Sequence, residues 1–345
     1  MSDRMSIGCA HEQGLYTVPA GSGTQFSDGC NTIWDLGLRA LKVACTSTYA
    51  TMYPLQTTWS STPTSLKTLA QTTQFSEQLA KAWDTVVFTI FTFANGATNW
   101  WRVNPSLAQY QAEYAEVYEL TAHLLTAYNN SGKVFVLQNW EGDWAFMDAF
   151  VPTTYVSRAF VDFYAAFFAA RQRAVSDARR DTPHVNVDVR HAIEVNRVLD
   201  AEQGNKRILT DIAPRIQPDM VSYSSYDSTI VSTGWGSGFS DWSAKCTADF
   251  SKALRRINSA FPGVPVQIGE FGFPENEDPR GAADVGRMVQ TVRDVAKSFG
   301  CVNLLYWQVF DNEPGTPPNA YRGYWLKNNL GAVTIAGAKL PMLAG

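Results

Sequence analysis

Short apolar runs alternate along the 345-residue chain with longer stretches in which apolar residues recur every three or four positions. The short runs are rich in Val, Ile and Phe and have the length of buried strands, whereas the longer stretches have the period of amphipathic helices. The runs of strand character cover 38–46, 85–93, 133–140, 184–193, 219–226, 264–270 and 302–310. We expect one more strand before them, within "MSIGCA" (5–10) or "GLYTVP" (14–19).

Two of the intervening stretches carry clear helix signals. In the first, we expect Asn104 to cap the helix, Pro105 to occupy its first turn and Asn130 to stop it. The second covers 283–300 and ends on Gly300, a typical residue after a helix C-terminus. Each has an apolar stripe: Leu107, Tyr110, Tyr114, Val117, Leu124 and Tyr128 in the first, and Val285, Met288, Val289, Val292, Val295 and Phe299 in the second.

Eight alternating strand and helix units without a linker predict an α/β fold, a single-domain (β/α)8 TIM barrel over 1–345. Such barrels take about 250 residues, so the surplus is expected in loops, above all in a Gly- and Ser-rich loop after the sixth strand at 227–245. A doubly wound open sheet is the alternative. It is disfavoured because neither "AGSGTQ" nor "GWGSG" follows a strand and opens a helix, as a phosphate-binding loop does.

Composition narrows the possible partners. The net charge is -4, and no cluster of Lys and Arg is interleaved with aromatic residues, so we expect no nucleic-acid binding. The longest apolar run, at 86–94, is far shorter than the roughly 20 residues that cross a bilayer, which predicts a soluble protein. Neither the five cysteines nor the four histidines have the spacing of metal ligands, so we expect no metal, no cofactor and no obligatory protein partner.

The compartment stays open. The N-terminus lacks the charged and apolar segments of a secretory signal, but a removed signal peptide leaves the same appearance. The protein is therefore expected to be secreted or periplasmic if a signal was removed, and otherwise cytoplasmic.

Two glutamates stand where predicted strands end. Glu270 closes the strand "VPVQIGE" between two glycines, and Glu141 follows the strand that contains "VFVLQ". Barrel enzymes place their chemistry at the C-terminal ends of the strands, so we expect the two acids to face each other across the barrel mouth. The chemistry that needs such a pair is glycosidic cleavage, in which one carboxyl protonates the leaving oxygen and the other captures the sugar.

The two carboxyl groups need different environments to perform different roles. Trp140 and Trp144 are candidates for an apolar wall that raises the pKa of Glu141, and Tyr226 is a candidate hydrogen-bond donor to Glu270. Glu194, at the end of the fifth predicted strand, is the alternative to Glu141 as the proton donor.

Several of these motifs resemble those of the clan A glycoside hydrolases, the retaining (β/α)8 enzymes that include family 5 and family 39. "IGEFG" is similar to the clan's nucleophile motif, "SYSSY" to its sixth strand and "LLYWQVFDNE" to its eighth; the likeness covers 33–340. The resemblance implies that Glu270 is the nucleophile and Glu141 the acid/base. Two departures weaken it: Trp140 separates Asn139 from Glu141, where the clan has adjacent Asn and Glu, and Lys42 stands where many members have Arg.

The sequence therefore predicts a retaining glycosidase that acts on a β-linked oligo- or polysaccharide. Many loop aromatics favour attack within a chain over attack at its end. The alternative is a barrel that binds carbohydrate or a partner protein without cleavage, because fold does not determine function. The residues expected to contact substrate, besides the catalytic pair, are Asn139, Tyr226, Trp307, Lys42, His191 and Trp144.

Overall fold

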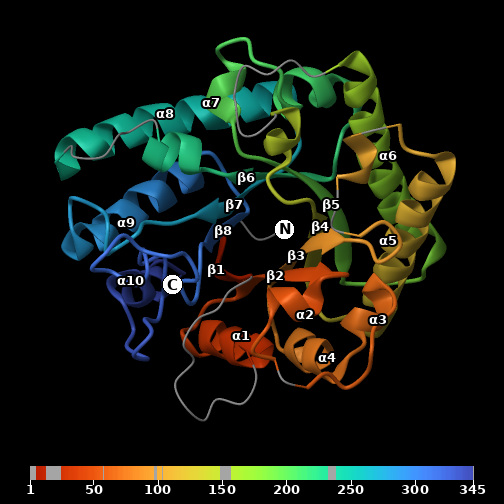
Figure 1. Cartoon of the computed structure of the whole chain (residues 1–345), viewed down its shortest axis with the longest axis horizontal. Helices are drawn as coiled ribbons and strands as arrows, with labels where there is room; N and C mark the ends of the chain where they lie inside the picture. Colours follow the sequence, from red (N-terminus) through yellow and green to blue (C-terminus); the bar gives the residue numbers. More distant parts are fainter. Residues whose placement is uncertain are drawn as a thin grey trace.

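The chain forms one closed barrel of eight parallel strands in the order β1 to β8, surrounded by helices (Figure 1). This computed structural model describes residues 5–12, 25–56, 58–96, 99–102, 104–147, 157–231 and 238–344. The predicted (β/α)8 barrel is confirmed, and all seven predicted strand runs contain a strand. The first strand, Ser6–His11, lies largely in "MSIGCA", whereas the other candidate, "GLYTVP", lies entirely outside the described residues.

The barrel strands are short and almost completely buried. They are β1 (Ser6–His11), β2 (Ala40–Thr46), β3 (Thr85–Phe91), β4 (Val134–Gln138), β5 (Asp188–Val195), β6 (Met220–Ser224), β7 (Val266–Phe271) and β8 (Asn303–Tyr306).

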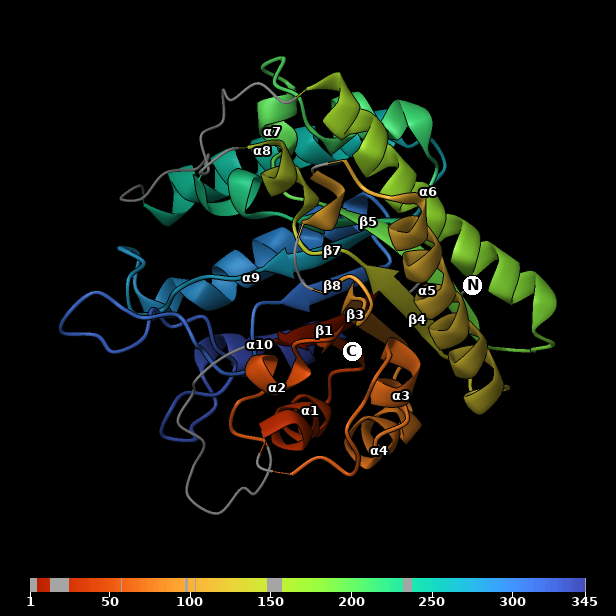
Figure 2. The same ribbon diagram turned by 45° about the vertical axis from the view of Figure 1, so that its right-hand side comes forward.

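Helices connect these strands on the outside of the barrel, and α5 and α6 lie side by side in both views (Figures 1 and 2). The α-helices are α1 (Gln25–Asp35), α2 (Tyr49–Met52), α3 (Leu66–Ala70), α4 (Thr73–Ala80), α5 (Leu107–Ala127), α6 (Arg158–Asp181), α7 (Val198–Ala201), α8 (Phe239–Ala260), α9 (Ala282–Ser298) and α10 (Ile335–Ala344). Short 3-10 or π turns are η1 (Trp100–Arg102), η2 (Gly142–Phe146), η3 (Ile208–Ile212), η4 (Ala213–Arg215) and η5 (Asp227–Val231).

The interior of the barrel changes from apolar to polar toward the C-terminal ends of the strands. One buried cluster consists of Ala40, Val87, Val136, Ala192, Met220 and Leu305. Two residues further along five of these strands are the buried polar residues Lys42, Thr89, Gln138, Glu194 and Ser222. Because side chains two apart on a strand point to the same face, each of these five strands carries one apolar and then one polar residue into the barrel. The polar layer forms the floor of the candidate site.

The predictions for the start of α5 and for the loop after β6 require correction. Helix α5 is capped by Ser106 and not by Asn104. The Ser106 hydroxyl accepts a hydrogen bond from the main-chain N–H of Gln109. At the start of its predicted stripe, Leu107 is 73% exposed. The predicted loop over 227–245 is helical on both sides of 232–237, since it contains η5 and the first residues of α8. The α9 stripe is confirmed from Val285 to Val295.

Three further observations bear on partners. No helix in the described ranges is long and apolar enough to cross a membrane. The five cysteines are buried and unpaired with one another. Within the same ranges, no group of three or more His, Cys, Asp or Glu side chains is arranged to hold a metal ion.

Candidate active site

Glu270 lies near the end of β7 and is almost completely buried in the barrel mouth. Its Oε1 accepts a hydrogen bond from Lys42 Nζ at 2.6 Å. The preceding residue must be small, because a β-carbon at Gly269 would lie 2.0 Å from Ser222 Oγ and 2.8 Å from Glu194 Oε1. The glycine before Glu270 therefore lets β7 pass close to the polar groups of its neighbours.

Glu141 reaches the same place from a turn rather than from a strand. Strand β4 ends at Gln138, and Glu141 immediately precedes η2 with φ +29° and ψ +64°. A residue with a side chain adopts this left-handed region at a cost, and such residues concentrate at functional sites. The Trp144 indole Nε1 donates to Glu141 Oε2 at 2.5 Å, which anchors the carboxyl group from within the same turn.

Ser224, at the end of β6, connects the two glutamates. Its Oγ lies 2.6 Å from Glu141 Oε1 and 3.3 Å from Glu270 Oε2. These two carboxylate oxygens are therefore no more than about 6 Å apart, the sum of two hydrogen-bond lengths. Residues remote in the sequence thus converge on one opening, as expected from their positions after β4 and β7.

The electrostatic surroundings of the two acids differ. Burial raises the pKa of Glu141 to about 7, the charge of Glu194 adds to the rise, and the hydrogen bonds from Ser224 and Trp144 oppose it. Burial also raises the pKa of Glu270, with Glu194 and Glu141 adding, but here Lys42 is the main opposing influence. The 2.6 Å contact with the Lys42 ammonium group favours the anion of Glu270, and no comparable cation contacts Glu141 in the described part of the chain.

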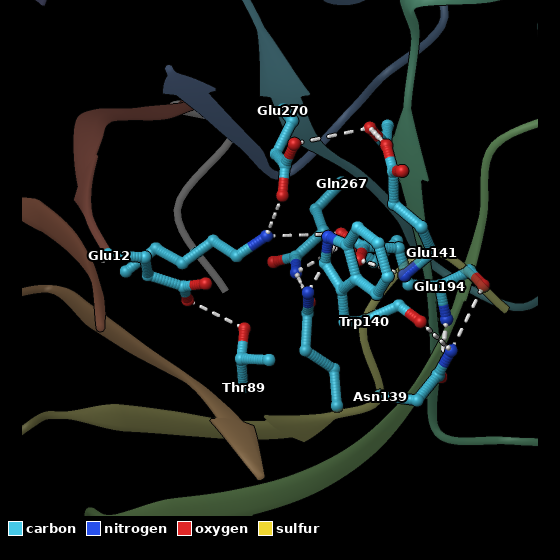
Figure 3. A network of polar contacts seen from close by, with 12 residues as sticks. Glu12, Thr89, Asn139, Trp140, Glu141, Glu194, Gln267 and Glu270 are labelled. Atoms are coloured by element: carbon cyan, nitrogen blue, oxygen red, sulfur yellow. Dashed lines mark hydrogen bonds and ion pairs between the residues drawn. The ribbon is translucent and has the colours of Figure 1, made fainter. Parts of the chain in front are cut away.

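Glu194 cannot be the proton donor to a substrate, because its side chain is completely buried. Its Oε1 accepts from Lys42 Nζ at 3.2 Å, Gln138 Nε2 at 2.8 Å and Ser222 Oγ at 3.3 Å. Its Oε2 accepts from the main-chain N–H of Glu141 at 2.8 Å. Figure 3 shows this carboxylate and that of Glu270 within one polar network inside the barrel.

Two predicted substrate contacts are wrong. Lys42 is completely buried below the two glutamates, so its ammonium group pairs with Glu194 and Glu270 and cannot reach a sugar. His191 is also completely buried; its Nδ1 lies 3.1 Å from Gln172 Oε1 of α6, and its ring packs near Phe168. It lies three positions before the inward-facing Glu194 on β5, and an odd spacing on a strand puts a side chain on the opposite face.

The side-chain amide of Asn139 bonds to main-chain groups beside the smaller cavity. Its Oδ1 accepts from the Glu194 N–H at 2.9 Å, and its Nδ2 lies 3.3 Å from the Glu194 carbonyl and 3.4 Å from that of Trp140. These bonds occupy the amide and join the ends of β4 and β5. Strand β4 ends at Gln138, so Asn139 and Glu141 both lie in the turn after it and not on the strand.

Two adjoining cavities lie over the polar layer and share the residues Trp140, Glu141 and Trp144. The larger, of about 430 Å³, is bordered by Glu270, Tyr226 and Trp307. The smaller, of about 230 Å³, is bordered by Trp101, Arg102 and Asn139 but not by Glu270. The proposed acid/base therefore lies between the cavities, while the proposed nucleophile borders only the larger one.

The predicted aromatic contacts differ in their surroundings. The indole of Trp307 donates to Glu313 Oε1 at 3.0 Å, which leaves the half-buried ring beside the larger cavity. The Tyr226 hydroxyl has no hydrogen-bond partner within the described residues, so the expected bond to Glu270 is not formed. Trp144 borders both cavities beside the Arg197 guanidinium, whose centre is 5.4 Å from the ring. Stacking of a sugar on these rings stays a prediction.

The class of protein that this fold and site resemble is the glycoside hydrolases. No protein-family model matches the chain, and no curated protein sequence matches it. Among solved structures, a GH5_18 protein from Bifidobacterium longum subsp. infantis superposes with a TM-score of 0.59 at 17% identity, covering 99% of this chain and 78% of the other.

A GH5_18 protein from Streptomyces cattleya in complex with GlcNAc gives 0.59 at 13% identity, with coverages of 99% and 79%. The exo-beta-1,4-mannosidase Op5Man5 from Opitutaceae bacterium strain TAV5 gives 0.62 at 10% identity, covering 99% of this chain and 59% of the other. These comparisons establish a shared TIM-barrel fold with family 5 glycoside hydrolases, and they confirm the resemblance to clan A at that level.

Sequence reasoning missed three polar groups that shape the site: Ser224, Gln138 and Glu12. Glu12, just after β1, is buried near Lys42 and accepts from Thr89 Oγ1 at 2.6 Å (Figure 3). The sequence contained a signal for two of them, because Gln138 and Ser224 are polar residues at the inward-facing ends of the buried strands β4 and β6. Polar residues at the last inward position of a barrel strand thus identify site residues.

Proposed function

We propose that the protein is a retaining glycoside hydrolase that cleaves a β-linked glycan, with Glu270 as the nucleophile and Glu141 as the acid/base. The observation that carries this proposal is the Ser224 hydroxyl, which lies within hydrogen-bond distance of both carboxylates. Retaining enzymes hold their two carboxyl groups about 5–5.5 Å apart and inverting enzymes roughly 6.5–9.5 Å apart. The shared hydroxyl supports the shorter class, because it limits the distance between the two carboxylate oxygens to about 6 Å, below the inverting range.

The surroundings of the two acids support these roles. Glu270, paired with Lys42, is the anion that attacks the anomeric carbon as the glycosidic C–O bond breaks. Glu141, with its pKa raised to about 7 by burial, donates its proton to the departing oxygen. Glu141 then takes a proton from water, whose oxygen attacks the anomeric carbon and releases Glu270 with overall retention.

The two cavities suggest where the two sides of the scissile bond lie. A sugar attacked by Glu270 fits the larger cavity, which Trp307 and Tyr226 also border. The leaving group fits the smaller cavity, because Glu141 is the acid that borders both. The similar structures include an exo-β-1,4-mannosidase, a complex with Manb1-4GlcNAc and a β-glucuronidase, so β-mannosides and β-glucuronides belong first in a substrate panel.

The test is turnover of a panel of aryl β-glycosides and β-linked mannans, glucans and xylans by the wild type and by E270Q and E141Q. We expect each variant to lose kcat by at least about 10³-fold on a glycan substrate while still binding it. The control is E119Q, on the exposed side of α5, which removes a carboxylate away from the barrel mouth and is expected to keep wild-type turnover.

Proton NMR of the first-formed sugar then distinguishes retention from inversion. Retention supports Glu270 as the nucleophile, whereas inversion contradicts the double displacement. Binding without turnover by the wild type contradicts the enzyme and favours the alternative, a non-catalytic carbohydrate-binding barrel.

A further inference from the structure

Glu194 is a buried carboxylate that cannot touch a substrate. It nevertheless bonds to Lys42, the ion-pair partner of Glu270, and to the main chain of Glu141. Lys42 bonds to both Glu194 and Glu270, so a single ammonium group connects Glu194 to the proposed nucleophile. On the other side, Glu194 Oε2 accepts the main-chain N–H of Glu141. The carboxylate therefore lies between the two groups that the proposed reaction needs.

The two oxygens of Glu194 have separate partners. Oε1 accepts from three side chains: Lys42, Gln138 and Ser222. Oε2 accepts from the Glu141 N–H, at 2.8 Å, as its hydrogen-bond donor within the described ranges. An ionised carboxylate accepts at both oxygens, whereas an amide accepts at one and donates at the other. A glutamine at 194 that satisfies the three side chains must direct its NH₂ group at the N–H of Glu141.

The bond to the Glu141 N–H acts where the chain is strained. Glu141 has a positive φ, between the end of β4 and the start of η2. Asn139 bonds both main-chain polar groups of Glu194, so the two chain segments are tied together twice. The Glu194 carboxylate accepts this charge-assisted bond from a strand position with buried neighbours on β5, so it is suited to hold the turn.

We propose that Glu194 is a positioning residue for the acid/base: it fixes the main chain of Glu141 in its left-handed conformation and thereby aims its carboxyl group at the cleft. This inference rests on the proposed function, since it assigns a role for Glu194 in the same reaction. It also gives the carboxylate a second effect, because its negative charge contributes to the raised pKa of Glu141.

Other charged groups also face Glu141. Lys42 lowers the pKa of Glu141, and Glu270 is joined to Glu141 through Ser224. The remaining titratable side chains around the two cavities are Arg102, Tyr164, Arg197, Tyr226, Asp227, Glu313, Arg322 and Tyr324. None of these eight is within hydrogen-bond distance of Glu141 in the part of the chain that the structure describes.

The test is the E194Q variant, with E12Q as the matched control. Both variants neutralise a buried carboxylate near Lys42, but only Glu194 bonds to Glu141. The readout is the titration of the Glu141 carboxyl carbon by ¹³C NMR, assigned by its absence in E141Q. This measurement does not depend on turnover, so it stands even if the proposed function fails.

In E194Q we expect the Glu141 titration to move to lower pH, because a negative charge next to it is lost. On the substrate found by the panel, we expect kcat to fall about 10²-fold, as when a catalytic group is displaced by about an ångström. E12Q should move the Glu141 titration less. An unchanged Glu141 titration in E194Q, or an equal shift in E12Q, overturns the proposal.

The E194D variant separates charge from position and serves if E194Q does not fold. Aspartate keeps the charge but is one methylene shorter, so it cannot reach the Glu141 N–H while it keeps the Lys42 contact. We expect kcat to fall while the Glu141 titration stays near that of the wild type. Wild-type kcat in E194D contradicts the positioning role.

Discussion

The Nζ atom of Lys42 lies 2.6 Å from Oε1 of Glu270, and both side chains are almost completely inaccessible to solvent. Four carboxyl groups lie around this one ammonium group or close to it: Glu12, Glu141, Glu194 and Glu270. Burial lowers the pKa of Lys42, but the charges of Glu194, Glu270 and Glu12 raise it by more, so the lysine stays charged. The acidic site thus depends on the buried cation of Lys42.

The first prediction concerns that cation. In K42M, Glu194 and Glu270 lose their ion-pair partner, and Glu270 is expected to take up a proton at neutral pH. We expect kcat to fall at least about 10²-fold, and the free energy of unfolding to fall by about 3–5 kcal/mol, as when one partner of a buried pair is removed. Steady-state kinetics and chemical denaturation measure the two effects.

The matched variant is K42R, which keeps the positive charge. It should retain more activity than K42M, despite the larger guanidinium group. Equal activity in K42M and the wild type shows that Glu270 needs no cation.

The second prediction is a pH dependence. Because the pKa of Glu141 is raised to about 7, kcat/KM should decline above about pH 7 as this acid loses its proton. The Trp144 indole stabilises the anion of Glu141, so W144F should raise the pKa and move the alkaline limb to higher pH. The pH profile of kcat/KM checks both statements.

W140F is the control for this experiment. Trp140 borders the same two cavities, but the side-chain donors to the Glu141 carboxylate in the described part of the chain are Trp144 and Ser224. Its alkaline limb should match the wild type, and a shift of the limb to lower pH in W144F contradicts the prediction.

The third prediction concerns the glycine before the nucleophile. In G269A, the added methyl group lies where Ser222 Oγ and Glu194 Oε1 stand, so β7 must move away from β6. We expect the free energy of unfolding to fall by about 1–3 kcal/mol, as in overpacked cores, and activity to be largely lost. G238A, where no atom lies within 4 Å of the added carbon, should change both far less. Similar losses in the two variants rule out a specific steric effect.

The fourth prediction tests the packing outside the barrel. Arg171 of α6 donates to Glu113 of α5 at 2.7 Å and to the Ile90 carbonyl of β3 at 3.0 Å. The side chains of Arg171 and Glu113 are buried between the helices and the barrel. R171M leaves Glu113 buried without its cation, so we expect a loss of about 3–5 kcal/mol in the free energy of unfolding. R180M removes an exposed partner of Asp177 on the same helix and should leave the denaturation midpoint nearly unchanged. Equal midpoints in the two variants contradict this difference.

The fold could be predicted from the amino-acid sequence, because hydrophobic periodicity and the Gly and Pro residues that end elements are local features. Apolar runs of strand length alternating with amphipathic stretches predict a (β/α)8 barrel, and the strand ends identify Glu141 and Glu270 as candidates. The strand period also contained a signal that the prediction did not use: His191 and Glu194 are an odd number of residues apart, so they cannot both face the cleft.

Which polar groups contact one another became known from the three-dimensional structure. A lysine is normally exposed, so nothing in "ALKVACT" predicts that Lys42 is buried; its burial is compensated by carboxylates from β5 and β7. The contact of Ser224 with the two glutamates is likewise absent from any local pattern, because it forms only when barrel closure brings the ends of β4, β6 and β7 around one opening. Contacts between remote strands depend on register and closure, and neither is encoded in any single segment.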